Sequence, residues 1–299
     1  MIQIRNRPIA RLIWQLGILL VLIGAGERLD GQEKSFLWKV QSDKNTVYIL
    51  GSIHFMKKEN YPLKKAIEQA FQSVKKLVLE IDLQSAEPEK MQGMMLQHGI
   101  NRDGKSLEDV VSNETYSLVA QRVKEMGLDI RALSSVKPWV VALTMTSLKL
   151  QQLGFDPQYG VDRYFFEKAQ AAHKGVAGLE TVEQQFSLLD QLSLQFQELM
   201  LRQTLKALDT LDKGVDQLVR SWLSGDSQIL EGLVLGSFKE YPELYQRIMF
   251  DRNRRWFLQI EKFLSQGEVY MVVVGAGHLV GKGSVIELLR ERGYRIEQL

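Results

Sequence analysis

The sequence predicts an α/β protein with a single domain, in which a mixed central sheet is built from both ends of the chain and a large helical insertion occupies about residues 85–265. Two similar stretches support the sheet. The apolar run at 47–50 leads into a Gly-x-x-His that ends at His54, and the apolar run at 270–274 leads into one that ends at His278. Short β-branched runs that end at glycine are typical of buried strands.

Composition narrows the class of protein. Among the 299 residues, 45% are hydrophobic and 25% charged, as in ordinary globular proteins. The net charge of +2 falls to −1 without residues 1–26, which carry three arginines and no acid, so we expect no nucleic-acid partner. The chain has no cysteine, which excludes disulfides, thiolate metal sites and a cysteine nucleophile.

The N-terminus has the layout of a targeting segment. Basic residues at 5–11 precede an almost wholly apolar stretch at 12–25, which is shorter than a membrane-spanning helix and fits the core of a signal peptide. Gly24 and Gly26 suit cleavage before Glu27. We therefore predict a signal peptide or N-terminal membrane anchor at 1–26, a linker at 27–35, and an exported, periplasmic or extracytoplasmic domain at 36–299.

The first half of that domain alternates strands with helices. Strands are expected at 36–41 and 47–53, joined as a hairpin by the polar turn 42–45, and a third strand at 76–82. Strand periodicity places Glu80 and Asp82 on one face of the third strand, with Leu79 and Ile81 on the other. A carboxylate in the middle of an apolar strand is costly unless it is paired or bound to a cation. Helical spacing is found at 61–74, 86–97, 113–126, 136–150 and 161–172.

The second half is mostly helical before the chain returns to the sheet. A short strand at 174–179 ends in Glu180, and Thr181 with Gln184 fits a capping box at a helix start. A long helical pattern follows at 183–214. Further helices are expected at 215–223, 226–235 and 240–265, then a strand at 268–274, a helix at 283–292 and a strand at 294–298.

His54 and His278 are the first candidates for a functional site, because open α/β sheets bind ligands at the C-terminal ends of their strands. With Glu80 they form a set of two histidines and one carboxylate, as at catalytic zinc, iron or manganese centres. One Gly-x-x-His alone more often marks an ordinary turn and histidine. Two equivalent copies and a glutamate in a strand favour a site.

Other candidates have alternative interpretations. Glu180 suits a general base or further ligand, or else a charge placed at a helix N-terminus. Arg252 shares a helix face with Arg255 and Gln259; an arginine there could hold a carboxylate or an oxyanion, or belong to a solvated basic face. Asp162 is either a helix-terminal charge or a site residue. The polar surroundings of the two remaining histidines, at 98 and 173, predict surface positions.

Known motifs of other enzymes are missing, since the sequence has no P-loop, GxGxxG, GxSxG or HExxH pattern. Several blocks instead resemble the TraB/GumN family, which includes the TIKI proteases. The resemblance spans residues 36–299. Its blocks are GSIHF (51–55), LEID (79–82), KPW (137–139), YGVD (159–162), GLETVEQQ (178–185), DRN (251–253) and GAGHLVGKGSV (275–285).

This resemblance implies a fold related to the erythromycin-esterase and ChaN-like proteins. From the TIKI branch it implies a metal-dependent protease that uses manganese or cobalt. Matched by motif, His54, Glu80 and His278 become the metal ligands, with Glu180 and either Arg252 or Asn253 as accessory residues.

The leading hypothesis is therefore an exported metal-dependent hydrolase of peptide or protein substrates, with manganese or cobalt suggested by resemblance and zinc or iron compatible with the ligands. One alternative is a metal-independent esterase-type hydrolase in which a histidine–glutamate pair activates water. Another is a non-catalytic protein that sequesters a peptide or carries haem. Membrane association through the N-terminal segment is compatible with all three hypotheses, and the oligomeric state stays open.

Overall fold

The computed structural model describes residues 34–102, 104–239 and 241–299. The predicted signal peptide or anchor, and the linker as far as residue 33, lie outside the described residues. Among those described, no helix combines the length and the apolar character needed to cross a membrane.

A six-stranded sheet in the order β4-β3-β5-β2-β1-β6 forms the centre of the fold. The four strands β4, β3, β5 and β2 run parallel, whereas β1 is antiparallel to both β2 and β6. The strands are Leu37–Gln41 (β1), Thr46–Ser52 (β2), Lys76–Ile81 (β3), Gly175–Glu180 (β4), Tyr270–Gly275 (β5) and Arg295–Gln298 (β6). The predicted α/β class, with a mixed sheet from both ends of the chain, is confirmed.

The two apolar runs of the Gly-x-x-His stretches are neighbours in this sheet. β2 and β5 pair in parallel, with Leu50 opposite Val273 and Gly51 opposite Val274. Both strands are buried along nearly their whole length, as expected for a parallel sheet with both faces covered. The pairing in register brings the two histidine loops to the same edge.

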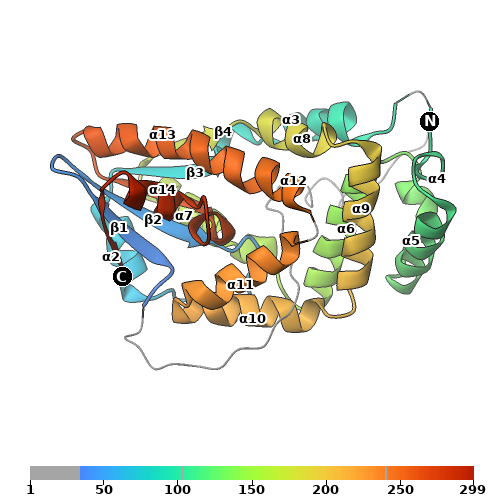
Figure 1. Cartoon of the computed structure of the whole chain (residues 1–299), viewed down its shortest axis with the longest axis horizontal. Helices are drawn as coiled ribbons and strands as arrows, with labels where there is room; N and C mark the ends of the chain where they lie inside the picture. The colour runs from blue at the N-terminus through green and yellow to red at the C-terminus, as the bar shows by residue number, and fades with distance from the viewer. Residues whose placement is uncertain (1–33, 103, 240) are drawn as a thin grey trace. The chain divides into compact units, whose positions relative to one another are not determined.

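The described chain forms two compact units. The sheet unit contains residues 34–83, 155–180 and 213–299. Within it, α7 packs on β3 and β4, while α13 contacts both β2 and α14 (Figure 1). Its helices are α2 (Lys65–Ser73), α7 (Val161–Ala171), α10 (Leu211–Ser224, which begins at the boundary), α11 (Ser227–Phe238), α12 (Pro242–Tyr245), α13 (Asp251–Ser265) and α14 (Val285–Glu291).

The helical unit contains residues 84–154 and 181–212. It is smaller than the predicted insertion because residues 155–180 return to the sheet as β4 and the chain after 212 packs with the sheet. In it, α9 packs on α5 and α6. Its helices are α3 (Pro88–Met94), α4 (Leu107–Val110), α5 (Asn113–Glu125), α6 (Pro138–Gln152), α8 (Val182–Asp190) and α9 (Leu194–Ala207).

Two predictions for the helical unit were wrong. The long helix expected at 183–214 is broken into α8, α9 and the start of α10, because the Ser193 hydroxyl caps a new helix by accepting from the Phe196 amide at 3.3 Å. His98 is buried rather than at the surface, since its Nδ1 lies 2.8 Å from an Asp190 carboxylate oxygen. The predicted capping box of Thr181 and Gln184 is present.

Candidate functional site

Each of the four parallel strands places one predicted site residue at the same edge of the sheet. His54 follows β2, Glu80 is the penultimate residue of β3, Glu180 is the last residue of β4, and His278 lies in the 3₁₀ turn directly after β5. The carboxyl ends of parallel strands meet at one edge, which is where α/β sheets bind ligands. All four residues belong to the sheet unit.

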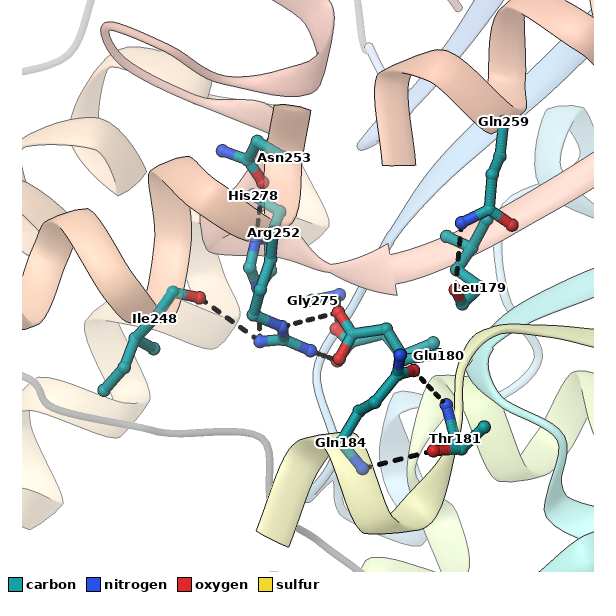
Figure 2. A network of polar contacts seen from close by, with 11 residues as sticks. Leu179, Glu180, Thr181, Gln184, Ile248, Arg252, Asn253, Gln259, Gly275 and His278 are labelled. Atoms are coloured by element: carbon teal, nitrogen blue, oxygen red, sulfur yellow. Dashed lines mark hydrogen bonds and ion pairs between the residues drawn. The ribbon is translucent and has the colours of Figure 1, made fainter. Parts of the chain in front are cut away.

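Arg252, near the start of α13, joins three of these residues (Figure 2). Its Nη2 donates to Glu80 Oε2 at 2.5 Å and its Nε to Glu180 Oε1 at 2.8 Å. Its Nη1 lies 3.1 Å from His278 Nε2. The side chain is only 2% exposed and its guanidinium carbon lies 4.5 Å from the centre of the Trp256 ring. Arg252 therefore binds the carboxylates of its own chain and is not part of a solvated face.

Glu80 is held in the ionised state. Burial by itself would raise the pKa of this carboxyl, but the Arg252 guanidinium and the nearby histidines outweigh burial and lower the pKa to about 2. Its second oxygen, Oε1, accepts a hydrogen bond from the Gly275 amide at 2.6 Å. Both carboxylate oxygens of Glu80 are thus engaged.

Gly275 marks the point where the three predicted ligands converge. A Cβ added at Gly275 would lie 3.1 Å from Glu80 Oε1, 3.4 Å from His278 Cδ2 and 3.9 Å from His54 Nε2. The contact with Glu80 Oε1 would be tight for any other residue, and the other two would be ordinary van der Waals contacts. The two histidines therefore meet in one site, as the paired motifs predicted.

His278 is neutral, with a defined tautomer. Its Nδ1 lies 2.6 Å from Asn253 Oδ1, and the Asn253 amide is oriented by its Nδ2, which donates to the Gly283 carbonyl at 2.9 Å. Nδ1 therefore carries the proton, and Nε2 accepts from Arg252. Burial and the Arg252 charge lower the pKa of His278 to about 3.

His54 has the opposite character. Burial would lower the pKa of this imidazole, but the Asp162 carboxylate, 3.1 Å from its Nδ1, and the charge of Glu80 raise the pKa to about 9. Asp162 is held in turn by Ser52, whose hydroxyl donates to Asp162 Oδ1 at 3.0 Å. Asp162 is therefore both the first-turn acid of α7 and a site residue that orients His54.

Glu180 differs from Glu80 in its protonation equilibrium. Burial raises the pKa of the Glu180 carboxyl, and Arg252 offsets the rise only in part. Its Oε2 is buried without a hydrogen-bond partner among the described residues. A buried carboxyl with a raised pKa and one free oxygen suits proton transfer.

The remaining predicted residues take other positions. Arg255 is exposed, and Gln259 lies away from the histidines, with its Nε2 donating to the Leu179 carbonyl at 2.9 Å. Sequence reasoning missed the Gly275 amide, the Ser52 hydroxyl and Trp256, whose ring centre lies 4.4 Å from that of His278. No pattern in the sequence distinguishes these three, since their roles arise from tertiary contacts.

The donor atoms suit a divalent cation, but Arg252 competes for them. The Nδ1 of each histidine faces an acceptor, so a cation could bind only at Nε2, which is how metal-binding histidines are usually oriented. Among the described residues, however, no three histidine or acidic side chains are arranged to hold a metal. The guanidinium already occupies His278 Nε2 and Glu80 Oε2, where a cation would bind.

Comparison with known proteins identifies the family. The family model for TraB/PrgY/gumN proteins matches residues 36–298. The chain belongs to the TraB/PrgY/gumN family. This confirms the family predicted from the paired Gly-x-x-His motifs and the blocks between them.

Two kinds of relative are found. The uncharacterized protein YbaP of Escherichia coli is 26% identical over 81% of this chain and 87% of its own length. A protein of Amphimedon queenslandica named as a metalloprotease TIKI homolog is 21% identical over 90% of this chain, and zebrafish (Danio rerio) metalloprotease TIKI1 is 22% identical over 88%. The matches cover 62% and 63% of those two relatives. No solved structure matches the chain.

Proposed function

We propose that this chain is a metal-dependent hydrolase that cleaves peptide bonds. The observation that carries the proposal is the convergence of His54, His278 and Glu80 around Gly275, with Glu180 joined to them through Arg252. The relatives named as metalloproteases support a peptide substrate.

His54, Glu80 and His278 would hold the cation, with manganese or cobalt favoured by the TIKI relatives. A cation held there would act as a Lewis acid, able to polarise the scissile carbonyl and to lower the pKa of bound water. Asp162 stabilises the protonated form of His54, and a cation can bind Nε2 only after the imidazolium has lost a proton. Cation affinity is therefore expected to rise with pH up to the His54 pKa of about 9.

The remaining residues handle protons and charge. Glu180 accepts the proton of the attacking water through its free Oε2 and delivers it to the leaving amine. Arg252 would stabilise the oxyanion or bind a substrate carboxylate once its guanidinium has left Glu80 and His278. Asp162 and Asn253 hold the two imidazoles in the tautomers that direct Nε2 into the site.

The test is cleavage of a fluorogenic peptide mixture by the purified full-length chain with Mn²⁺ or Co²⁺. Glu180→Gln is expected to lower kcat about 10²- to 10⁴-fold, the range of general base catalysis. His54→Ala and His278→Ala are expected to lose both cation binding and cleavage. His173→Asn, at an exposed histidine, serves as the control. If both alanine variants keep full cation binding and full activity, the proposal is wrong.

A second candidate is a hydrolase that needs no metal. It is favoured by the ion network itself, in which Arg252 already supplies positive charge and the Asp162-paired His54 holds a proton that it could give to a leaving group. Metal analysis of the purified protein separates the two candidates. Full activity after removal of all metal by EDTA would establish the second.

We also propose that the protein acts outside the cytoplasm, carried there by its N-terminal segment. The basis is the basic and then apolar layout of residues 1–26. Fractionation of cells that express the full chain tests this, together with N-terminal sequencing of the mature product. Retention in the cytoplasm would refute export, and an intact N-terminus in the membrane fraction would indicate an anchor.

A further inference from the structure

Arg252 forms hydrogen bonds to the same side chains that are predicted to bind the metal. Its three guanidinium nitrogens each reach a different site residue: Glu80, Glu180 and His278. Nη1 also lies 3.4 Å from the Ile248 carbonyl. A buried arginine is usually held by carboxylates and carbonyls, and a bond to a histidine ring nitrogen uses the lone pair that a metal would need.

The bond to His278 makes arginine and cation mutually exclusive at that atom. With its proton on Nδ1, neutral imidazole has a single lone pair, on Nε2. The side-chain carbonyl oxygen of Asn253 accepts a hydrogen bond from Nδ1 of His278 and so fixes the proton on that nitrogen. While this contact lasts, the ring cannot change to the other tautomer. A cation that takes His278 Nε2 must first displace Nη1 of Arg252.

Charge compensation makes the exchange possible. Glu80 and Glu180 are both buried, and Arg252 is the cation that bonds to both. Two buried carboxylates without a compensating charge are strongly destabilising. A divalent cation provides that compensation, so either the guanidinium or the cation can satisfy the carboxylates.

The local structure allows the guanidinium to move without moving its helix. Arg252 follows a π-helical turn, Gln246–Phe250, and its guanidinium rests on the Trp256 ring one turn later. Because the guanidinium is planar and rigid, its Nη groups can leave Glu80 and His278 only if the whole group turns about the bonds of the arginine side chain, and this rotation leaves the helix in place.

We propose that Arg252 is an exchangeable internal cation, which holds Glu80 and His278 in the metal-free protein and releases them when a divalent cation binds. The inference rests on the proposed metal-dependent function and deepens it. In this proposal Arg252 lowers the affinity of the site for a divalent cation, in addition to its proposed role toward substrate.

The test compares Mn²⁺ binding to the metal-free full-length wild type and to Arg252→Met, by calorimetry and by thermal unfolding. The variant is expected to unfold at a lower temperature than the wild type without metal, and to bind Mn²⁺ at least tenfold more tightly. Mn²⁺ is expected to raise its unfolding temperature more than that of the wild type. Arg255→Met, an exposed arginine of the same helix, should match the wild type.

Two outcomes would overturn the exchange. Equal or weaker Mn²⁺ binding by Arg252→Met overturns the exchange, while peptide cleavage by the wild type with Mn²⁺ would leave the proposed function standing. Absence of Mn²⁺ binding by both proteins overturns the exchange and the metal-dependent function together. If Arg252→Met does not fold, Arg252→Lys gives the same comparison, because one ammonium cannot make all three contacts. Arg252→Lys is expected to bind Mn²⁺ more tightly than the wild type, by a smaller factor than Arg252→Met.

Discussion

His54 and His278 occupy equivalent places after two neighbouring strands, yet their partners give them opposite protonation states. The partner of His54 is the carboxylate of Asp162, which favours the imidazolium, whereas the partner of His278 is the amide oxygen of Asn253, beside the cationic Arg252. Below its pKa of about 9, His54 thus carries a proton on both ring nitrogens, whereas His278 carries one on Nδ1 only. The two Gly-x-x-His motifs are alike in sequence, but their histidines differ in protonation state.

This asymmetry predicts a pH dependence of stability. The pKa of His54 is about 9 in the folded protein and about 6.5 unfolded, so the stabilisation is full below pH 6.5 and is lost as the pH rises through 9. A shift of this size corresponds to roughly 3 kcal/mol. Urea unfolding in EDTA at pH 6 and pH 9.5 should show the loss in wild type and much less of it in Asp162→Asn. An equal loss in both proteins would contradict the assigned pairing.

Among the secondary-structure elements, the strands were the most predictable. Apolar runs that stop at glycine located β2 and β5, and strand alternation placed Glu80 in β3. The breaks between α8, α9 and α10 were not predicted, because leucine and phenylalanine recur at helical spacing across both breaks. Periodicity reports which face is buried and does not report where the chain changes direction.

The site was predictable to the same extent. Residues at strand ends could be inferred, because the carboxyl ends of parallel strands share one edge. The contacts from Asp162 to His54 and from Asn253 to His278 join distant segments, and nothing local encodes them. The position of Arg252 between the predicted metal ligands could not be predicted either. Helical periodicity indicates which face of a helix a residue occupies, but not which residues of other elements it contacts.

The approach of α7 to the first histidine loop offers a test at this scale. A Cβ added at Gly160 would lie 2.5 Å from the His54 carbonyl oxygen and 3.0 Å from Asp162 Oδ1. Gly160→Ala should therefore lower the free energy of unfolding by about 1–3 kcal/mol, as overpacking does, and reduce activity. Gly93→Ala, where α3 leaves open space, should be neutral or stabilising. Equal effects of the two substitutions on unfolding and activity would contradict the close approach.

In the molecule as a whole, the candidate site residues all belong to the sheet unit. His54, Glu80, Asp162, Arg252 and His278 all fall in that unit. The helical unit has a buried polar cluster of its own, in which Asp190 bonds both His98 and Lys137. Since burial and ion pairing also occur for structural reasons, the two clusters should respond differently to mutation.

His98→Ala tests this separation. Loss of the buried bond to Asp190 should lower the free energy of unfolding by about 1–3 kcal/mol, measured in urea, while Mn²⁺ affinity stays unchanged. His173→Asn, at an exposed position, should change neither quantity by more than about 0.5 kcal/mol. A marked loss of Mn²⁺ affinity in His98→Ala would show that the two clusters are coupled.

The most direct test of a cation site at the paired histidines is a crystal structure of the protein grown with Mn²⁺, with anomalous diffraction recorded at the manganese edge. We expect one strong anomalous peak within bonding distance of Nε2 of His54, Nε2 of His278 and the Glu80 carboxylate, with the Arg252 guanidinium withdrawn from His278. A fully loaded crystal in which manganese binds elsewhere, with Arg252 still bonded to Glu80 and His278, would contradict this expectation.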